Sequence, residues 1–211
     1  MFIKFCGFTR AEDVEAACAL PISAVGFVFY IHSRRSIEPG KAAQLSRIAH
    51  RAGIQCAGVF AGRSEAEIRA ICEAADLDLI QLYEHELIPA LHGFRPIIAA
   101  HRVTSSADCA AIEPPLPGDC VLLDRRAEGS LGGTGKGFDW NCLKDFALLD
   151  RAIIAGGINE ENAASLLDEH RPYGIDLSSG IEDFPGLKST EKMKAFMKKI
   201  NMVMKNETHA R

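Results

Sequence analysis

The stretch AIIAGGINEENAASLLDEHRPYGIDLSSGIEDFPG, residues 152–186, decides the fold of this chain. It contains two short apolar runs, at 152–155 and 173–177, which have the length of buried strands. Each run ends in small residues, Gly156-Gly157 after the first and Ser178-Ser179-Gly180 after the second. A helix-forming segment lies between the two runs. The order therefore predicts a strand, a glycine turn, a helix, a strand and a second glycine turn.

The two glycine turns have the character of an anion site. Glycine lets backbone N–H groups approach a phosphate closely, and a helix N-terminus adds a favourable partial charge. Two such turns late in a repeating chain resemble the phosphate site after strands seven and eight of a (β/α)8 barrel. We therefore expect Gly156, Gly157, Ser179 and Gly180 to bind phosphate. The alternative is a pair of ordinary βα turns, and the number of preceding βα units decides between the two interpretations.

Six earlier apolar segments alternate with helix-forming segments. Residues 24–30, AVGFVFY, form a nearly continuous apolar run, as expected for a parallel strand that is buried on both faces. The six expected strands are 2–5, 24–30, 55–60, 77–82, 96–100 and 120–123. The other expected helices are 11–20, 39–52, 64–75, 86–91, a fifth from Ser105 or Ser106 to before Pro114, a sixth capped by Asp139, and 190–204.

Eight strands alternating with eight helices predict an α/β protein, a single (β/α)8 TIM barrel over residues 1–211. The connections have ordinary lengths, and no linker divides the chain. A doubly wound open sheet is the alternative, but nothing in the sequence marks a dinucleotide-binding turn.

Composition narrows the function classes. The chain is 47% hydrophobic and 25% charged, as in ordinary soluble proteins, and its net charge of −4 gives no reason to expect nucleic acid or an anionic membrane as partner. No apolar run approaches the ~18 residues that span a bilayer, and no signal-peptide pattern is present. The seven cysteines form no CxxC pair, so spacing predicts neither a zinc site nor a disulfide framework. We expect reduced thiols and a cytoplasmic location.

The functional groups of such a barrel lie where its strands end. The residues expected there include a thiol at Cys6, a cation at Arg34 or Arg35, and carboxylates at Asp124 and Asp176. Nothing among them resembles a metal cluster, so we expect no metal and no cofactor. The set predicts acid–base chemistry on a phosphorylated small molecule.

Cys6 and Asp124 are the candidates for this chemistry. Cys6 follows a four-residue strand and lies near Lys4 and a helix start, so positive neighbours are expected to favour its thiolate, a competent base. Asp124 ends an apolar strand, where burial raises the pKa of a carboxyl group, as suits a general acid. The alternatives are a cysteine that packs as a small hydrophobe and an aspartate that caps a helix or lies in a loop.

A glycine-rich segment, GGTGK at residues 132–136, invites comparison with a phosphate-binding P-loop. The spacing excludes this interpretation, because Ser130 stands where the first glycine would be and Gly137 follows the lysine. A mobile loop over the barrel mouth fits better, with Lys136 near the charged groups of the substrate.

Short segments spread along the chain carry a family resemblance. They are KFCGFT (4–9), GFVFY (26–30), SRR (33–35), QL (81–82), LLD (122–124), GGTGKGFDW (132–140), AGGIN (155–159), DLSSGIE (176–182), and PG with Lys188 (185–188). In this order they resemble the phosphoribosylanthranilate isomerases of tryptophan biosynthesis over almost the whole length. The resemblance implies a cofactor-free Amadori rearrangement, from N-(5-phosphoribosyl)anthranilate to 1-(2-carboxyphenylamino)-1-deoxyribulose 5-phosphate.

The resemblance also implies roles by position. Cys6 would be the general base and Asp124 the general acid, on opposite sides of the sugar. Arg35 aligns with the arginine that meets the anthranilate carboxylate, for which its planar guanidinium is suited. The glycine turns would hold the phosphate. The further residues expected to bind substrate are Lys4, Lys136 and Asp176.

One position departs from the family pattern. The family has Gln-Leu-His-Gly after its fourth strand, whereas this chain has Tyr83-Glu84 in place of the last two residues. That change supports one alternative, a barrel that binds ribosyl phosphates without turnover. Another alternative is a related isomerase of a different ribosyl phosphate, but it would use a carboxylate in place of Cys6. We expect a phosphoribosyl small molecule as the ligand, no nucleic-acid or membrane partner, and a monomer or homodimer.

Overall fold

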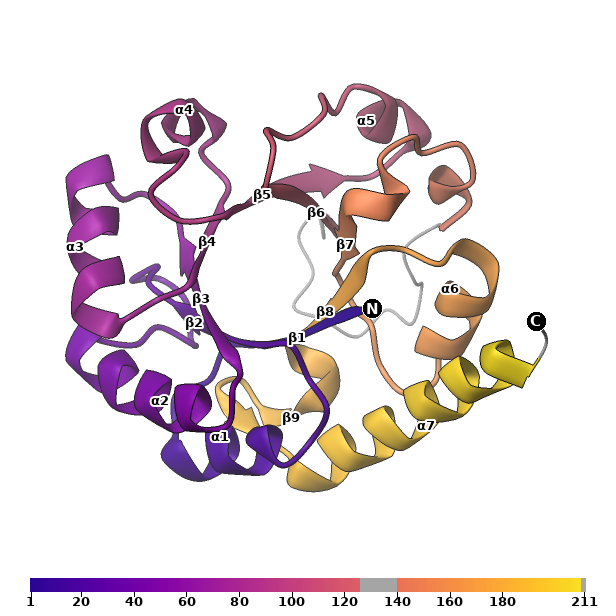
Figure 1. Ribbon diagram of the computed structural model, residues 1–211, viewed down its shortest axis with the longest axis horizontal. Helices are drawn as coiled ribbons and strands as arrows, with labels where there is room; N and C mark the ends of the chain where they lie inside the picture. The colour runs from indigo at the N-terminus through magenta and orange to yellow at the C-terminus, as the bar shows by residue number, and fades with distance from the viewer. Residues whose placement is uncertain (126–139, 210–211) are drawn as a thin grey trace.

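Eight parallel strands close into one barrel at the centre of the molecule (Figure 1). The computed structural model describes residues 1–125 and 140–209. Each strand pairs with the next, and the last pairs with the first, so the closed (β/α)8 fold is confirmed and an open sheet is excluded. The strands are β1 (Phe2–Cys6), β2 (Ala24–Val28), β3 (Gln55–Phe60), β4 (Leu79–Leu82), β5 (Ile97–Val103), β6 (Cys120–Arg125), β7 (Ala152–Ile154) and β8 (Gly174–Leu177).

Helices surround the barrel, and the last one lies along the outside next to α1 and α6 (Figure 1). The α-helices are α1 (Ala11–Cys18), α2 (Pro39–Arg51), α3 (Glu65–Ala75), α4 (Ile88–Leu91), α5 (Ser106–Ala110), α6 (Ala163–His170) and α7 (Thr190–His209). The 3₁₀ turns are η1 (His85–Leu87), η2 (Trp140–Leu143), η3 (Leu149–Arg151) and η4 (Ser179–Ile181), and a small hairpin, β9 (Glu182–Phe184) and β10 (Leu187–Lys188), follows β8. Among the described residues, no helix combines the length and apolarity needed to cross a membrane.

The predicted sixth helix is wrong in its described part. Asp139, its expected cap, lies outside the described residues, and the chain after it forms η2 and η3 instead of an α-helix. The apolar residues Leu143, Phe146 and Leu149 recur at a spacing of three, and the backbone hydrogen bonds around them link residues three apart. A spacing of three matches the repeat of a 3₁₀ helix, which places these side chains on one face toward the core.

The strands are buried on both faces, as their apolar runs predicted. Small and branched side chains fill the barrel interior, among them Ala24, Ala57, Ile98, Leu122 and Ile153. The larger core lies between the barrel and the helices. Because successive side chains along a strand alternate between these two faces, each strand contributes to both cores.

The seam between β1 and β8 closes the barrel. Lys4 is in register with Asp176, and its Nζ lies 2.9 Å from Asp176 Oδ1 with the lysine fully buried. Gly174 allows the two strands to meet, because a Cβ there would lie 2.5 Å from the carbonyl oxygen of Phe2. The seam brings the start of the chain to the glycine turn that follows β8.

Substitution of Gly174 tests how tightly the seam is packed. We expect Gly174→Ala to lower the free energy of unfolding by about 1–3 kcal/mol, because the added methyl group meets the backbone of β1. Gly40 in α2 has no atom within 4 Å of an added Cβ, so Gly40→Ala should be neutral or stabilise by about 0.5–1 kcal/mol. Urea unfolding measures both. Equal effects of the two substitutions would contradict this account of the seam.

Candidate active site

A pocket of about 1070 Å³ opens at the carboxyl ends of the barrel strands. The predicted site residues that line it are Cys6, Arg35, Asp124, Gly156, Gly157, Asp176 and Ser179. Lys4 lies deeper in the barrel and is fully buried. Gly180 packs against the preceding turn and does not line the described part of the pocket. Lys136 lies outside the described residues.

Cys6 ends β1 and is buried at the pocket. Gly26, its neighbour on β2, leaves space for the thiol, because a Cβ there would lie 2.7 Å from Cys6 Sγ. Burial raises the pKa of Cys6, although the ammonium groups of Lys4 and Lys188 act in the opposite direction. The positive neighbours act as expected, but the expectation of a favoured thiolate was wrong, because burial in the closed barrel outweighs them. The raised pKa makes the Cys6 thiolate a stronger base than an ordinary thiolate. It also means that a smaller fraction of Cys6 is ionised at neutral pH.

Lys4 and Asp176 form a buried ion pair next to this thiol. Burial alone would lower the pKa of Lys4, but Asp176 and Cys6 outweigh burial and raise it. Lys4 is therefore a fixed positive charge beneath the pocket. It balances Asp176, which lines the pocket, and it also attracts any negative charge that develops on Cys6.

Asp124 lies near the end of β6 with Tyr83 as its partner. Tyr83 Oη donates a hydrogen bond of 3.0 Å to Asp124 Oδ2. Burial raises the pKa of Asp124, and the hydrogen bond from Tyr83 only partly offsets it, so the predicted direction is confirmed. The Arg102 guanidinium lies 5.1 Å from the centre of the Tyr83 ring and supports its position. The tyrosine that departs from the family pattern thus contacts the candidate acid directly.

Two charged residues after the last barrel strand, Glu182 and Lys188, form a network that reaches Cys6 and that no sequence pattern indicated. Glu182 in β9 accepts hydrogen bonds from Arg35, with Nε 2.9 Å from Oε1 and Nη2 2.6 Å from Oε2. Lys188 in β10 lies 2.7 Å from Glu182 Oε1 and also donates to the carbonyl oxygen of Cys6. Burial would raise the pKa of Glu182, but these two cations lower it. Both residues occur in the resembling segments, yet they follow the last barrel strand, where no periodic pattern identifies a function.

Gln81 in β4 is a third residue for which the sequence pattern indicated no role. It lines the pocket and is buried, and its Oε1 has no hydrogen-bond partner among the described residues. A buried amide oxygen without a partner is costly, so a ligand that donates a hydrogen bond here would be stabilised.

The two glycine turns lie side by side, as predicted. Gly156 and Gly157 have φ of +84° and +83°, a conformation that side chains with a Cβ rarely adopt. A Cβ on Gly180 would overlap the carbonyl oxygen of Ile158, so the second turn packs directly on the first. Gly156, Gly157 and Ser179 face the pocket together.

Fold and site define a class. A (β/α)8 barrel with a thiol, a partly buried carboxyl group and paired glycine turns around a pocket at the carboxyl ends of its strands has the architecture of a barrel enzyme. Comparison with known proteins gives the family. The family described as N-(5'phosphoribosyl)anthranilate (PRA) isomerase matches residues 3–199. The chain belongs to this family and is an isomerase.

Individual relatives agree with this assignment. The chain is 37% identical to the N-(5'-phosphoribosyl)anthranilate isomerase of Pseudomonas fluorescens over 199 residues, which are 93% of this chain and 94% of that protein. The solved phosphoribosyl anthranilate isomerase of Thermotoga maritima is 31% identical, with a TM-score of 0.84 over 96% of this chain and 99% of that one. Another solved isomerase, 29% identical with a TM-score of 0.81 over 96% of this chain and 99% of its own, is in complex with reduced 1-(o-carboxyphenylamino)-1-deoxyribulose 5-phosphate.

The raised pKa of Asp124 has a consequence for stability. Its folded-state pKa exceeds the unfolded value, so stability is lost as pH rises from about 4 through the folded pKa. Asp124→Asn removes this loss, and Tyr83 can still donate to the amide oxygen. We expect the variant to be more stable at pH 7 by on the order of 1 kcal/mol, with the gain shrinking as pH falls toward 4.

Urea unfolding across this pH range measures the difference. Asp168→Asn on α6, at an exposed position, is the control and should change little. A gain for Asp124→Asn that grows on acidification would mean that the folded protein lowers this pKa.

Proposed function

We propose that this enzyme performs the Amadori rearrangement of N-(5-phosphoribosyl)anthranilate to 1-(2-carboxyphenylamino)-1-deoxyribulose 5-phosphate, in the biosynthesis of tryptophan. The observation that carries the proposal is one pocket that is lined by Cys6, Asp124 and the two glycine turns. The reaction needs one acid and one base on a phosphorylated sugar, and the pocket offers both from different strands.

Asp124 supplies the first proton. Its raised pKa keeps a larger share of the carboxyl group protonated, as a general acid requires. It protonates the furanose ring oxygen while the bond from that oxygen to C1 breaks, and the nitrogen lone pair forms a C1=N double bond. The product of this step is an open-chain, positively charged Schiff base. Tyr83 then donates its hydrogen bond to the carboxylate that remains.

Cys6 removes the second proton. Its thiolate takes the hydrogen from C2, and the electrons of that bond form C1=C2 while the C1=N electrons return to nitrogen. The resulting enolamine tautomerises to the ketone. Lys4 and Lys188, which favour the negative form of Cys6, offset part of the cost of burying the thiolate.

The remaining residues bind and orient the substrate. Backbone N–H groups of the two glycine turns hold the phosphate, as at other barrel phosphate sites. Arg35 meets the anthranilate carboxylate through Nη1, because Glu182 occupies Nε and Nη2 and no described residue bonds to Nη1. Asp176 lines the pocket over Lys4, and Lys136 is kept as a proposed contact to the charged groups of the substrate.

The proposal also covers the location, the oligomeric state and the ligand of the enzyme. All seven cysteines lie in the described ranges and no disulfide joins them there, and a cytoplasmic location is part of the proposal. A solved relative from Thermotoga maritima is described as monomers derived from a dimeric isomerase, so monomer and homodimer are the two assemblies that we consider. The partner is the phosphoribosyl substrate.

Removal of either proton-transfer group should nearly abolish turnover. We expect Cys6→Ala and Asp124→Asn each to lower kcat by about 10²–10⁴-fold, the usual contribution of a general acid or base. Because the mechanism needs Asp124 protonated and Cys6 ionised together, kcat/KM of the wild type should rise with pH up to the pKa of Asp124, stay level, and fall once pH exceeds the raised pKa of the Cys6 thiol. Steady-state kinetics measures both.

Cys109→Ala removes another buried thiol, on α5, and serves as the matched control. A Cys6 or Asp124 variant that keeps more than about a tenth of wild-type kcat would remove that residue from the mechanism. Absence of turnover in the wild type would favour the alternative of a barrel that only binds ribosyl phosphates.

Arg35 should govern recognition of the aromatic carboxylate. Lysine cannot reproduce the planar fork that bonds both Glu182 and a substrate carboxylate, so we expect Arg35→Lys to lower kcat/KM by ~10-fold or more, at least ~1.4 kcal/mol. Affinity for inorganic phosphate should not change, because that ligand contacts only the glycine turns. The neighbouring Arg34 is exposed, and Arg34→Lys is the control. A larger loss of kcat/KM in Arg34→Lys than in Arg35→Lys would contradict the assignment of the substrate carboxylate to Arg35.

A further inference from the structure

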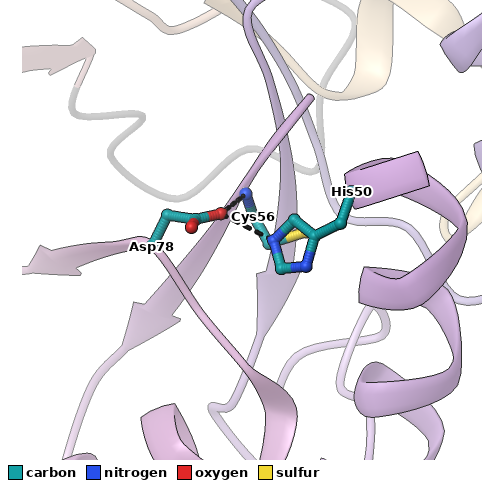
Figure 2. A group of neighbouring side chains, drawn as sticks. All are labelled: His50, Cys56 and Asp78. Atoms are coloured by element: carbon teal, nitrogen blue, oxygen red, sulfur yellow. Dashed lines mark hydrogen bonds and ion pairs between the residues drawn. The ribbon is translucent and has the colours of Figure 1, made fainter. Parts of the chain in front are cut away.

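A second group of chemically versatile side chains lies where β3 and β4 begin, at the end of these strands opposite the pocket. Figure 2 shows the three side chains together. His50 comes from the last turn of α2, Cys56 from β3 and Asp78 from the residue before β4. The donor atoms of the three side chains all lie within 4.8 Å of one another. We propose that His50, Cys56 and Asp78 bind a divalent cation of borderline softness, with zinc as the type.

The donor set selects this class of cation. A thiolate sulfur and an imidazole nitrogen favour zinc and similar metals, whereas magnesium and calcium prefer oxygen ligands alone. Bond lengths of about 2.0–2.3 Å put two ligands of a tetrahedral zinc ion roughly 3.3–3.8 Å apart. The imidazole Nε2 and Asp78 Oδ2 lie 2.9 Å apart and the widest pair at most 4.8 Å. Side-chain rotations that move the donor atoms by about 1 Å would therefore bring them to the separations of a zinc site.

Surrounding hydrogen bonds already orient two of the ligands. His50 Nδ1 lies 3.2 Å from Asp76 Oδ2, the carboxylate–histidine arrangement that holds a metal-bound imidazole in one tautomer. His50 Nε2 and Asp78 Oδ2 form a 2.9 Å hydrogen bond without the metal, and a cation bound between the two atoms would take the place of the shared proton. Asp78 Oδ2 also accepts a 2.7 Å hydrogen bond from the backbone N–H of Cys56, which fixes the carboxylate beside the cysteine.

The exposure of the three side chains determines from which side a cation would reach the site. Cys56 is fully buried, whereas the side chains of His50 and Asp78 are 29% and 38% exposed, so a cation enters from their side and water takes the fourth position. Burial raises the pKa of Cys56 to about 12, so the thiol keeps its proton until the metal replaces it. Binding breaks the S–H bond, forms a sulfur–metal bond and releases one proton to solvent.

The bound ion would join α2, β3 and the segment between α3 and β4, and its role would be to stabilise this end of the barrel. No spacing in the sequence indicates such a site, because each ligand comes from a different element. The inference stands apart from the proposed function, since the pocket lies at the other end of the strands.

Cobalt(II) is the probe for the experiment, because thiolate ligation gives a sulfur-to-cobalt charge-transfer band in the near ultraviolet. We expect the full chain, after chelator treatment, to bind one Co²⁺ with this band, to exchange it for Zn²⁺, and to gain thermal stability with Zn²⁺. Cys56→Ser should lose the band. His50→Gln should weaken Co²⁺ binding by at least about 100-fold, and Asp76→Asn, which alters only the outer partner, by about 10–100-fold.

Cys72→Ser is the matched control. Cys72 in α3 is also fully buried, and burial also raises its pKa to about 12, but it is not part of the group. Its variant should bind Co²⁺ as the wild type does. The proposal is overturned if the wild type gives no charge-transfer band, if the band persists in Cys56→Ser, or if Cys72→Ser loses it. Should Cys56→Ser not fold, unchanged Co²⁺ affinity in His50→Gln overturns the proposal instead.

Discussion

The pairing of β1 with β8, with the buried Lys4–Asp176 ion pair across it, is the constraint on which the site depends. Along β1, Cys6 follows Lys4 by two residues and so shares its face of the strand. The glycine turn after β8 follows the strand that pairs with β1. In the hairpin after that turn, Lys188 donates a hydrogen bond to the carbonyl oxygen of Cys6. The two ends of the chain thus meet at the pocket, which β6 supplies with Asp124.

Cys6 is buried and Asp124 is partly buried, and both have raised pKa values, yet their surroundings differ. Two ammonium groups act on the thiol and favour its charged form. The carboxyl group has a neutral hydroxyl, from Tyr83, as its hydrogen-bonding partner. Both pKa values shift upward, so the two sites differ in the partners of the titratable group and not in the direction of the shift. This asymmetry supports Cys6 as the base and Asp124 as the acid in the proposed mechanism.

The strands and the barrel could be predicted from the sequence, because parallel strands buried on both faces produce apolar runs that alternate with helical segments. The segment after Asp139 could not, because Leu143, Phe146 and Leu149 follow a repeat of three that suits a 3₁₀ turn. Ionisation of Cys6 was misjudged because the extent of burial is a property of the closed barrel. His50, Cys56 and Asp78 meet only through tertiary packing, so no local pattern could identify them.

The central claim is that Cys6 and Asp124 act on one sugar whose phosphate lies in the glycine turns. A crystal structure with reduced 1-(o-carboxyphenylamino)-1-deoxyribulose 5-phosphate tests it most directly. The account predicts the phosphate at Gly156, Gly157 and Ser179, C2 within about 3.5 Å of Cys6 Sγ, and the oxygen on C4 within about 3.2 Å of Asp124. A phosphate bound elsewhere in the pocket, or a C2 atom out of reach of Cys6, would contradict the account.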